Sequence, residues 1–393
     1  MQELRVNQGI PSHLLWLIIL TTGFSIANLY YCQPLLGMIR LEMNVSEVQV
    51  NAISIVSQLG YALGLLFIVP LGDMIKRKPI ILANFGIITL ALLVIGSAHN
   101  IYIILIASLV TGLCSVTPQL FLPMVSQYSL AQDRGRNVGL VLSGLLTGIL
   151  ASRVISGFVG ELWGWRSMYY LAAIIMAISF IILYRYFPTI LPTFKGSYKN
   201  LMKSLVKIAK EEPSLRFASI KSGLAFGSFL SLWAMLAFKM ALPPFYAGGT
   251  IVGLLGLCGV AGALTASTIG KYVDRIGIYR INFIGGFLIL FGWGLLYFLQ
   301  YHYFGIISGI IILDIGMQCI QLGNQTNMLS LRPEAVNRVN TIFMTTYFIG
   351  GTLGTTLSGF AWAYLQWTGI ALIGATLVSA SLLLNLYQWY NKK

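Results

Sequence analysis

Charged side chains are scarce in this sequence: Asp, Glu, Lys and Arg make up only 9% of its 393 residues, and only 11 residues are acidic. Soluble globular domains carry about 25% charged residues, so this composition excludes an ordinary soluble protein. Hydrophobic residues, in contrast, account for 57% of the chain. The sequence therefore predicts an integral membrane protein.

Cysteine and histidine are also rare. The cysteines lie singly in separate apolar stretches, with no Cys-x-x-Cys pair, so we expect small packing residues and no metal site. The histidines lie near the ends of predicted helices, and no His-Glu-x-x-His, Gly-x-Ser-x-Gly or nucleotide-binding loop occurs. These absences argue against an enzyme, against a cofactor and against ATP coupling. The residues concerned are Cys32, Cys114, Cys258, Cys319, His13, His99 and His302.

Apolar runs of roughly 20 residues, the length that crosses a bilayer as a helix, recur along the whole chain. Short polar segments separate them, and almost all charged residues fall in these segments. The expected fold class is an all-α integral membrane protein with twelve transmembrane helices. The predicted helices are 14–38, 47–71, 79–97, 101–126, 136–160, 166–187, 215–238, 247–270, 280–299, 303–330, 336–361 and 368–388.

The net charge of +14 comes from basic residues whose positions indicate membrane topology and not a nucleic-acid footprint. With the N-terminus inside, all but four of the 25 basic residues fall in cytoplasmic segments. The exceptions are Arg40, Arg166 and Lys239 on the outer side and Arg153 inside a predicted helix. We therefore expect a multi-pass protein of the plasma or inner membrane, with both termini cytoplasmic and membrane lipid as its surroundings.

One hydrophilic segment, 188–214, interrupts the apolar pattern near the middle of the chain. Its lysines at 199, 203, 207 and 210 share one helical face, as in an amphipathic helix lying near acidic lipid. The sequence thus divides into a six-helix bundle at 1–187, a cytoplasmic linker at 188–214 and a second six-helix bundle at 215–393.

The two halves resemble each other at an offset of about two hundred residues. Asp73 matches Asp274, Gln119 matches Gln321 and Gly148 matches Gly350, while Ser156-Gly157-Phe158 matches Ser358-Gly359-Phe360. An internal repeat of this kind predicts two pseudo-symmetric bundles with a site between them near the bilayer midplane.

The loop after the second predicted helix carries the residues of a known signature, Gly-x-x-x-Asp-Arg-x-Gly-Arg/Lys-Arg/Lys. The second half has a good copy in 270–277, and the first half a less complete one in 70–78, where Val69, Met74 and Lys76 replace signature residues. With these motifs the chain resembles the major facilitator superfamily over essentially its whole length. Asn28-Leu29-Tyr30-Tyr31-Cys32-Gln33-Pro34 and Gly164-Trp165-Arg166 are similar to its bacterial drug and sugar efflux branch.

The resemblance implies a gate at the cytoplasmic face. A carboxylate at the end of one helix can lie against the partially positive N-terminus of a helix in the other bundle. By this resemblance Asp73 and Asp274 have the latch role, with four arginines as charge partners; the alternative is that these residues only form turns and set topology. The four arginines are Arg77, Arg134, Arg136 and Arg275.

Two ionisable residues lie at membrane depth, where a charge is expensive and therefore points to function. Asp314 lies within predicted helix 303–330, and Arg153 lies within 136–160. Lys221, in contrast, lies near enough to a helix end for its side chain to reach the membrane surface. If Asp314 exchanges protons as water access alternates, the two residues couple transport to protons. The competing interpretation is a purely structural ion pair that holds the two halves together.

Polar residues below Asp314 follow one helical face, with Gln318, Gln321 and Gln325 at i+4, i+7 and i+11. Lipid would not tolerate such a face, so it must line a cavity or contact another helix. The resemblance implies that the first, fourth, seventh and tenth helices line the cavity. The candidate cavity residues are Asn28, Tyr31, Gln119, Trp233, Gln318, Gln321 and Gln325.

Together these features predict a secondary active transporter that works by alternating access and exports a small organic solute, such as a drug, sugar or metabolite, with protons as the coupling ion. The alternative is a facilitator or importer of a small nutrient without proton antiport. The glycine pattern of antiporters is only partly present, because Ile149 and Ser152-Arg153 replace its proline and glycine pair. The family resemblance implies a monomer.

Overall fold

The computed structural model describes residues 8–130, 132–190, 192, 196–262, 264–265, 276–329, 331–332 and 335–391. Within these ranges every regular element is a helix. The first half contains α1 (Ser12–Ala27), α2 (Cys32–Met43), α3 (Glu47–Phe67), α4 (Leu71–Met74), α5 (Arg77–Ser97), α6 (Ile101–Cys114), α7 (Thr117–Tyr128), α8 (Arg134–Trp163) and α9 (Trp165–Tyr186). The linker contains α10 (Tyr198–Glu211). The second half contains α11 (Pro213–Ala241), α12 (Gly249–Leu255), η1 (Gly256–Cys258), α14 (Ile278–Phe298), α15 (Tyr303–Leu329) and α16 (Val336–Tyr390).

Two predicted helices are each broken into two. The run 14–38 becomes α1 and α2, separated by the turn 28–31, and the run 101–126 becomes α6 and α7. Pro118 occupies the first turn of α7, where its missing N–H costs no helical hydrogen bond. Within a continuous helix the same proline would break the hydrogen-bond pattern. Both breaks leave backbone polar groups in the protein interior, close to the polar side chains described below.

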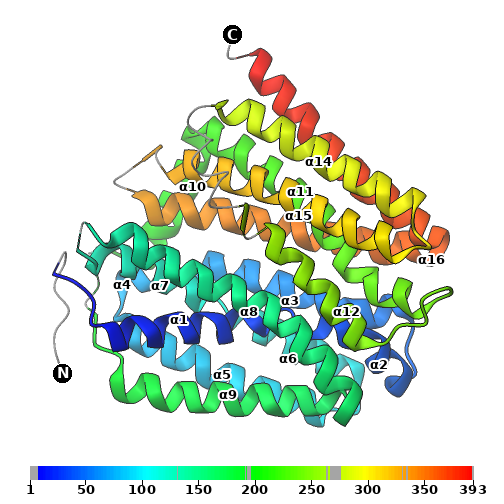
Figure 1. Cartoon of the computed structure of the whole chain (residues 1–393). Coiled ribbons are helices and arrows are strands. Elements are labelled where there is room, and N and C mark those ends of the chain that lie inside the picture. The colour runs from blue at the N-terminus through cyan, green and yellow to red at the C-terminus, as the bar shows by residue number, and fades with distance from the viewer. Residues whose placement is uncertain are drawn as a thin grey trace.

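The described residues contain ten helices that are long and apolar enough to cross a membrane. The longest, α16, has 55 residues, and Gln366 within it has a non-helical backbone (φ 51°, ψ −139°). Figure 1 shows that α16 turns back on itself there, from its orange to its red leg. The apolar helix Gly249–Gly262 is shorter, and residues 266–275 after it lie outside the described part. The number twelve therefore stays a prediction.

Glycines bring the helices of each half into close contact, which matters in a membrane because lipid provides no hydrophobic drive for association. In the first half Gly23 of α1 packs on the backbone of Gly144 and Gly148 in α8. In the second half Gly223 of α11 packs in the same way on Gly350 of α16. The same packing scheme thus occurs in both halves.

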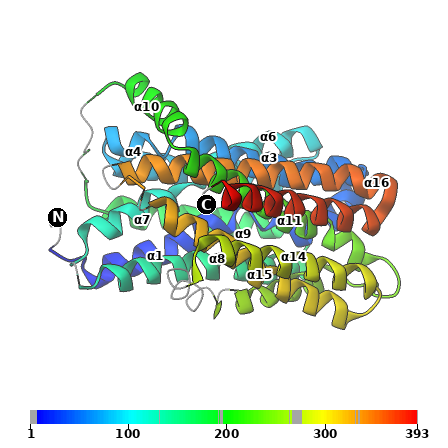
Figure 2. The ribbon, with the colours of Figure 1, turned by 90° about the horizontal axis from the view of Figure 1, so that it is seen from above.

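Contacts between the halves also come in matched pairs. The side chain of Asn51 in α3 donates a hydrogen bond to the carbonyl of Thr355 in α16 (3.1 Å). Gly253 of α12 packs on the carbonyl of Arg153 in α8. Asn51 and Gly253 are 202 positions apart, and so are Arg153 and Thr355. Figures 1 and 2 show the two halves side by side, with α3 beside α16 and α12 beside α8.

The linker helix α10 contacts α11 and α16, and Figure 2 shows it leaning away from the bundle. Its apolar residues Leu201, Leu205 and Ile208 are buried against the protein, so they do not face lipid as an interfacial helix would. The four lysines of the predicted basic face, at 199, 203, 207 and 210, are exposed. The linker is therefore a packed element with a basic outer face.

The close helix contacts make a direct prediction about glycine substitution. We expect Gly350→Ala to lower stability by ~1–3 kcal/mol, because the new Cβ would overlap the backbone of Gly223. Gly294→Ala in α14 is the matched control, since its Cβ would meet nothing within 4 Å, and alanine is favoured over glycine in a helix by about 1 kcal/mol. Thermal unfolding of the purified protein in detergent measures both; equal midpoints would contradict the packing described.

Candidate substrate and coupling site

Arg153 lies at the meeting point of the two halves, with only 2% of its surface exposed. Its Nε donates a hydrogen bond to Oε1 of Gln33 in α2 (2.8 Å). The guanidinium carbon lies 3.8 Å from the centre of the Trp233 ring and 5.1 Å from that of Tyr30. An aromatic clamp of this kind stabilises a desolvated cation through the negative faces of the rings.

The clamp leaves part of the guanidinium without a partner. Nη2 of Arg153 is buried and makes no hydrogen bond, and the same is true of Nε1 of Trp233. Buried donors of this kind are rare in folded proteins, because an unmade hydrogen bond costs about 1–3 kcal/mol. They are therefore candidates for contact with a ligand.

Asp314 in α15 is equally buried, with 6% of its surface exposed, and its Oδ2 has no hydrogen-bond partner. Arg153 and Asp314, both within the described residues, interact electrostatically but have no nitrogen–oxygen contact within 4.0 Å. The structural ion pair considered from the sequence is therefore not formed.

The apolar helix Gly249–Gly262 separates the two charges; we call it the glycine segment. A Cβ at Gly256 would lie 3.1 Å from Cδ of Arg153, and one at Gly259 would lie 3.8 Å from both carboxylate oxygens of Asp314. Gly256 and Gly259 are about one helical turn apart. Both charged side chains thus approach the glycine segment within one turn of each other, and at Gly256 a side chain would press on Arg153.

The glutamine stripe below Asp314 contacts α16. Oε1 of Gln321 accepts a hydrogen bond from the Tyr347 hydroxyl (3.0 Å), and Nε2 of Gln325 lies 3.4 Å from Oδ1 of Asn340. Gln318, one turn below Asp314, is half-buried. Two of the three glutamines are therefore held by neighbouring helices.

The other predicted cavity residues lie in different places. Asn28 is buried and donates to the carbonyls of Phe24 and Ser25 beside the break between α1 and α2. Tyr31 is buried at the start of α2, and Trp233 forms the clamp on Arg153. Gln119 in α7 accepts a hydrogen bond from Nδ2 of Asn340 (3.3 Å), which joins the two halves.

A stack of aromatic rings continues from the glutamine stripe across the interface between the halves. Tyr347 stacks on Phe226 of α11 with ring centroids 4.0 Å apart. Phe348 contacts Phe226 and also Tyr61 of α3, whose centroid lies 4.4 Å away. These rings join α3, α11 and α16 into one apolar wall beside the polar residues.

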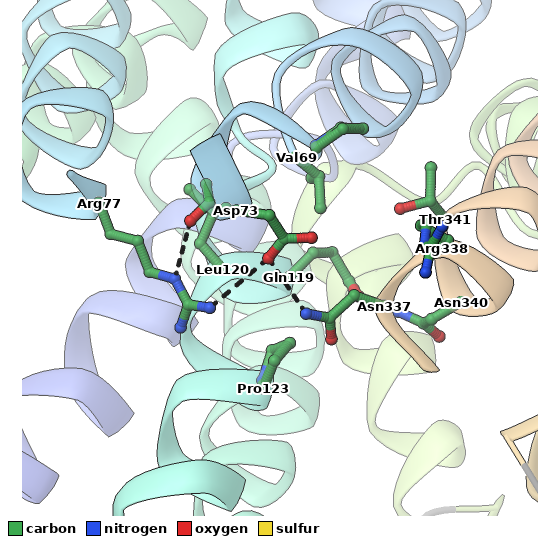
Figure 3. Close-up of a pocket in the computed structure, with 12 residues that line it drawn as sticks. Val69, Asp73, Arg77, Gln119, Leu120, Pro123, Asn337, Arg338, Asn340 and Thr341 are labelled. Atoms are coloured by element: carbon green, nitrogen blue, oxygen red, sulfur yellow. Dashed lines mark hydrogen bonds and ion pairs between the residues drawn. The ribbon is translucent and has the colours of Figure 1, made fainter. Parts of the chain in front are cut away.

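A pocket lies at the end of the bundle that carries the loop 73–78, which we call the basic end (Figure 3). There Asp73 accepts a hydrogen bond from Nδ2 of Asn337 (3.2 Å), and its Oδ1 lies 3.8 Å from Nη2 of Arg77. Asn337 is the second residue of α16, so Asp73 faces a helix N-terminus of the other half. Gln119 and Asn340 line the same pocket, whereas Arg153 and Asp314 do not.

Two of the remaining predicted gate residues belong to α8. Arg134 and Arg136 lie in the first turn of α8, and both side chains are exposed. Asp274 and Arg275 lie outside the described residues. Nearby, Arg332 donates to Glu212 (2.7 Å), and this hydrogen bond raises the pKa of Arg332 above its usual range.

The opposite end of the bundle is also joined across the halves. Nε1 of Trp362 in α16 donates to Glu47 at the start of α3 (2.6 Å). The hydroxyl of Thr250 in α12 donates to Glu161 of α8, and Gly157 packs on the backbone of Gly249. In this structure both ends of the bundle are therefore tied by polar contacts between the halves.

Several residues of the site were not found from the sequence. Gln33 lies within a recognised motif, but nothing in the sequence pairs it with Arg153, and Asn337 and Asn340 resemble ordinary residues of a helix start. Lys221 was expected to reach the membrane surface. The structure instead buries it to 2% exposure, where Nζ donates to Asn385 (3.0 Å). Its position about two turns into an apolar helix was the signal that could have indicated burial.

Comparison with known proteins identifies the class. A profile of the Major Facilitator Superfamily matches residues 15–355. A putative uncharacterized transporter, YgaY, of Escherichia coli K12 is 34% identical over 384 residues, covering 98% of this chain and 96% of the relative. The chain therefore belongs to the Major Facilitator Superfamily, and it is a multi-pass membrane transporter of small solutes and not an enzyme.

Two further comparisons bear on the fold and on more distant relatives. The crystal structure of a variant of the nucleoside transporter NupG superposes with a TM-score of 0.78 at 15% identity, covering 95% of this chain and 98% of that one. Multidrug resistance protein D of Escherichia coli K12 is 24% identical over 257 residues, covering 61% of this chain and 65% of the relative. The similarity to NupG concerns the fold and carries no information about the substrate.

The contact at the basic end makes a testable prediction. We expect Asn337→Ala to open this end more often, because it removes the hydrogen bond to Asp73, and a bond to a charged group contributes about 1.5 kcal/mol or more. The readout is thiol labelling of Thr341→Cys, which lines the pocket, in a cysteine-free background. Labelling should accelerate roughly tenfold.

Ser143→Ala is the control for this experiment, because the Ser143 hydroxyl bonds only within its own helix. It should leave the labelling rate at position 341 unchanged. An unchanged rate in the Asn337→Ala protein would show that the Asp73 contact does not hold the basic end closed.

Proposed function

We propose that this transporter exports a small organic solute in exchange for protons by alternating access, and that Asp314 carries the coupling proton. The observation that supports this most is a buried carboxylate whose Oδ2 has no hydrogen-bond partner and no ion pair within 4.0 Å. The charged form of a carboxyl group is unfavourable in such surroundings, so the group can take up a proton whenever water reaches it. Arg153, without a formed ion pair, is its electrostatic partner.

The titratable groups around Asp314 are consistent with Asp314 as the single proton carrier. Those that interact electrostatically with it are Arg153, Cys258 and Tyr347. Among the described residues, Asp314 is the one acidic residue in the interior of a membrane-spanning helix, α15. The other acidic residues lie near helix ends or in loops. A single acid supports exchange of one proton per transport cycle.

Alternating access requires that the two ends open in turn, and the contacts between the halves suit this. At the basic end the halves meet through Asp73 and Asn337, and at the opposite end through Glu47 and Trp362. Each is a small polar contact that one rocking motion can break while the other holds. We propose that Arg77, Arg134, Arg136, Asp274 and Arg275 contribute charge to the contact at the basic end.

The proposed direction and location of transport rest on sequence features and on one relative. The efflux assignment rests on the sequence similarity to the drug and sugar efflux branch and on the relative named Multidrug resistance protein D. The distribution of basic residues favours a cell inner membrane, with the basic end and both termini cytoplasmic. We propose that the transporter acts as a monomer.

The test of proton coupling is the Asp314→Asn variant in proteoliposomes. We expect it to fold and to bind solute but to lose transport driven by a pH gradient, because asparagine cannot exchange a proton. Asp133→Asn is the control, since Asp133 precedes α8 at the basic end and lies far from the central charges. Retention of a normal pH dependence by Asp314→Asn would rule out Asp314 as the proton carrier.

A facilitator or importer of a small nutrient is the second candidate. The presence of only one buried acid among the residues that the structure describes favours it. Collapse of the proton gradient with an uncoupler separates the two functions. It should stop concentrative export by an antiporter, whereas a facilitator would continue to equilibrate solute at the same rate.

A further inference from the structure

We infer that the central site selects solutes without net charge that carry hydrogen-bond donors and acceptors together, such as hydroxylated or amide-containing molecules, and that it excludes organic cations. This inference rests on the proposed function only in taking the surroundings of Arg153 and Asp314 as the place where solute binds. It adds the substrate class, which neither the fold nor the comparisons supply.

The first support is the set of polar atoms that the protein itself leaves without partners. Nη2 of Arg153 and Nε1 of Trp233 are buried donors, and Oδ2 of Asp314 is a buried acceptor. The tryptophan ring lies against the guanidinium, so the two donors are neighbours. A solute that satisfies all three atoms must accept hydrogen bonds at one edge and donate at another.

The second support is the geometry of the two charges. Arg153 lies against Gly256 and Asp314 against Gly259, about one helical turn apart on the glycine segment. A small solute that contacts the carboxylate therefore also lies close to the side chain of Arg153. The glycines themselves place no side chain beside either residue.

The third support is the balance of charge. A guanidinium and a carboxylate together leave the site neutral, and low-dielectric surroundings strengthen any added charge interaction. A cation that approaches Asp314 meets the fixed positive charge of Arg153, which the clamp of Gln33, Tyr30 and Trp233 holds in place. An anion fits beside Arg153 only when Asp314 is protonated.

Charge selection also fixes the sign of coupling. A neutral solute that donates a hydrogen bond to the Asp314 carboxylate favours its ionised form and so competes with the proton, which is the requirement for antiport. An anion, in contrast, would bind together with a proton and move in the same direction. Of the neutral and anionic classes, only the neutral one is therefore compatible with exchange of solute for proton at this site, and the charge of Arg153 excludes the cationic class.

The test uses three ligands of one scaffold: phenyl β-glucoside, its 6-amino-6-deoxy analogue and phenyl β-glucuronide, which at pH 7 are neutral, cationic and anionic. Calorimetry on the purified protein in detergent, without any gradient, measures their affinities. We expect the neutral ligand to bind wild-type protein at least tenfold more tightly than the cationic one. Equal or tighter binding of the cation, or no binding of any of the three, would overturn the inference.

Variants of the clamp sharpen the test. In Arg153→Gln the order should reverse, with at least a tenfold gain for the cationic ligand, because Asp314 then remains as the single charge. Arg153→Lys keeps the charge and should keep the wild-type order. If Arg153→Gln does not fold, Asp314→Asn replaces it, and this variant should bind the anionic ligand at least tenfold more tightly than wild type; an unchanged order in either variant would refute charge selection.

Failure of this inference is distinguishable from failure of the proposed function. Binding without a gradient reports charge selection alone, whereas the pH-driven transport of Asp314→Asn reports proton coupling. A site that prefers the neutral ligand in a protein without proton coupling would refute antiport and leave the substrate class standing. The reverse result would refute the substrate class and leave antiport standing.

Discussion

The structure depends most on the burial of one guanidinium between its two halves. A charge at membrane depth is costly unless its surroundings replace water. Here Arg153 donates a hydrogen bond to Gln33 and lies against the faces of Tyr30 and Trp233. These partners come from α2, α11 and the turn between α1 and α2. Because Arg153 itself belongs to α8, its burial joins the helices around which the halves meet.

Close helix packing makes the burial of Arg153 possible. Comparison of equivalent positions in the two halves shows where the structure departs from symmetry. Asn51 on Thr355 and Gly253 on Arg153 are equivalent contacts in the two halves. The first contact joins the amide of Asn51 to Thr355, whereas the second joins a glycine, Gly253, to the buried Arg153. The glycine is needed where the arginine is, because a side chain at 253 would overlap the carbonyl of Arg153. The buried charge thus belongs to only one member of this pair of matched contacts.

Much of the fold follows from the sequence, because long apolar runs leave few alternatives to membrane helices, and Asp314 and Arg153 stood out by their depth in such runs. Their surroundings could not be predicted. The hydrogen bond between Gln33 and Arg153 spans 120 residues, and a hydrophobic pattern holds no information about such a contact. Lys221 was wrongly assigned to the membrane surface, because the pattern does not show that Asn385 of a distant helix is available to receive it.

The polar contacts of α15 link the central charges to the basic end. Asp314 and Gln325 lie on the same helix, three turns apart; Gln325 contacts Asn340 of α16, and Asn340 in turn donates to Gln119 of the first half. Asn340 lies one turn from Asn337, which holds Asp73. Under the proposed mechanism, a shift of α15 that changes the access of water to Asp314 would therefore also disturb the contacts at the basic end. Because the links from Asn340 to Gln325 and Gln119 are single hydrogen bonds between amides, each is weak enough to break in every transport cycle.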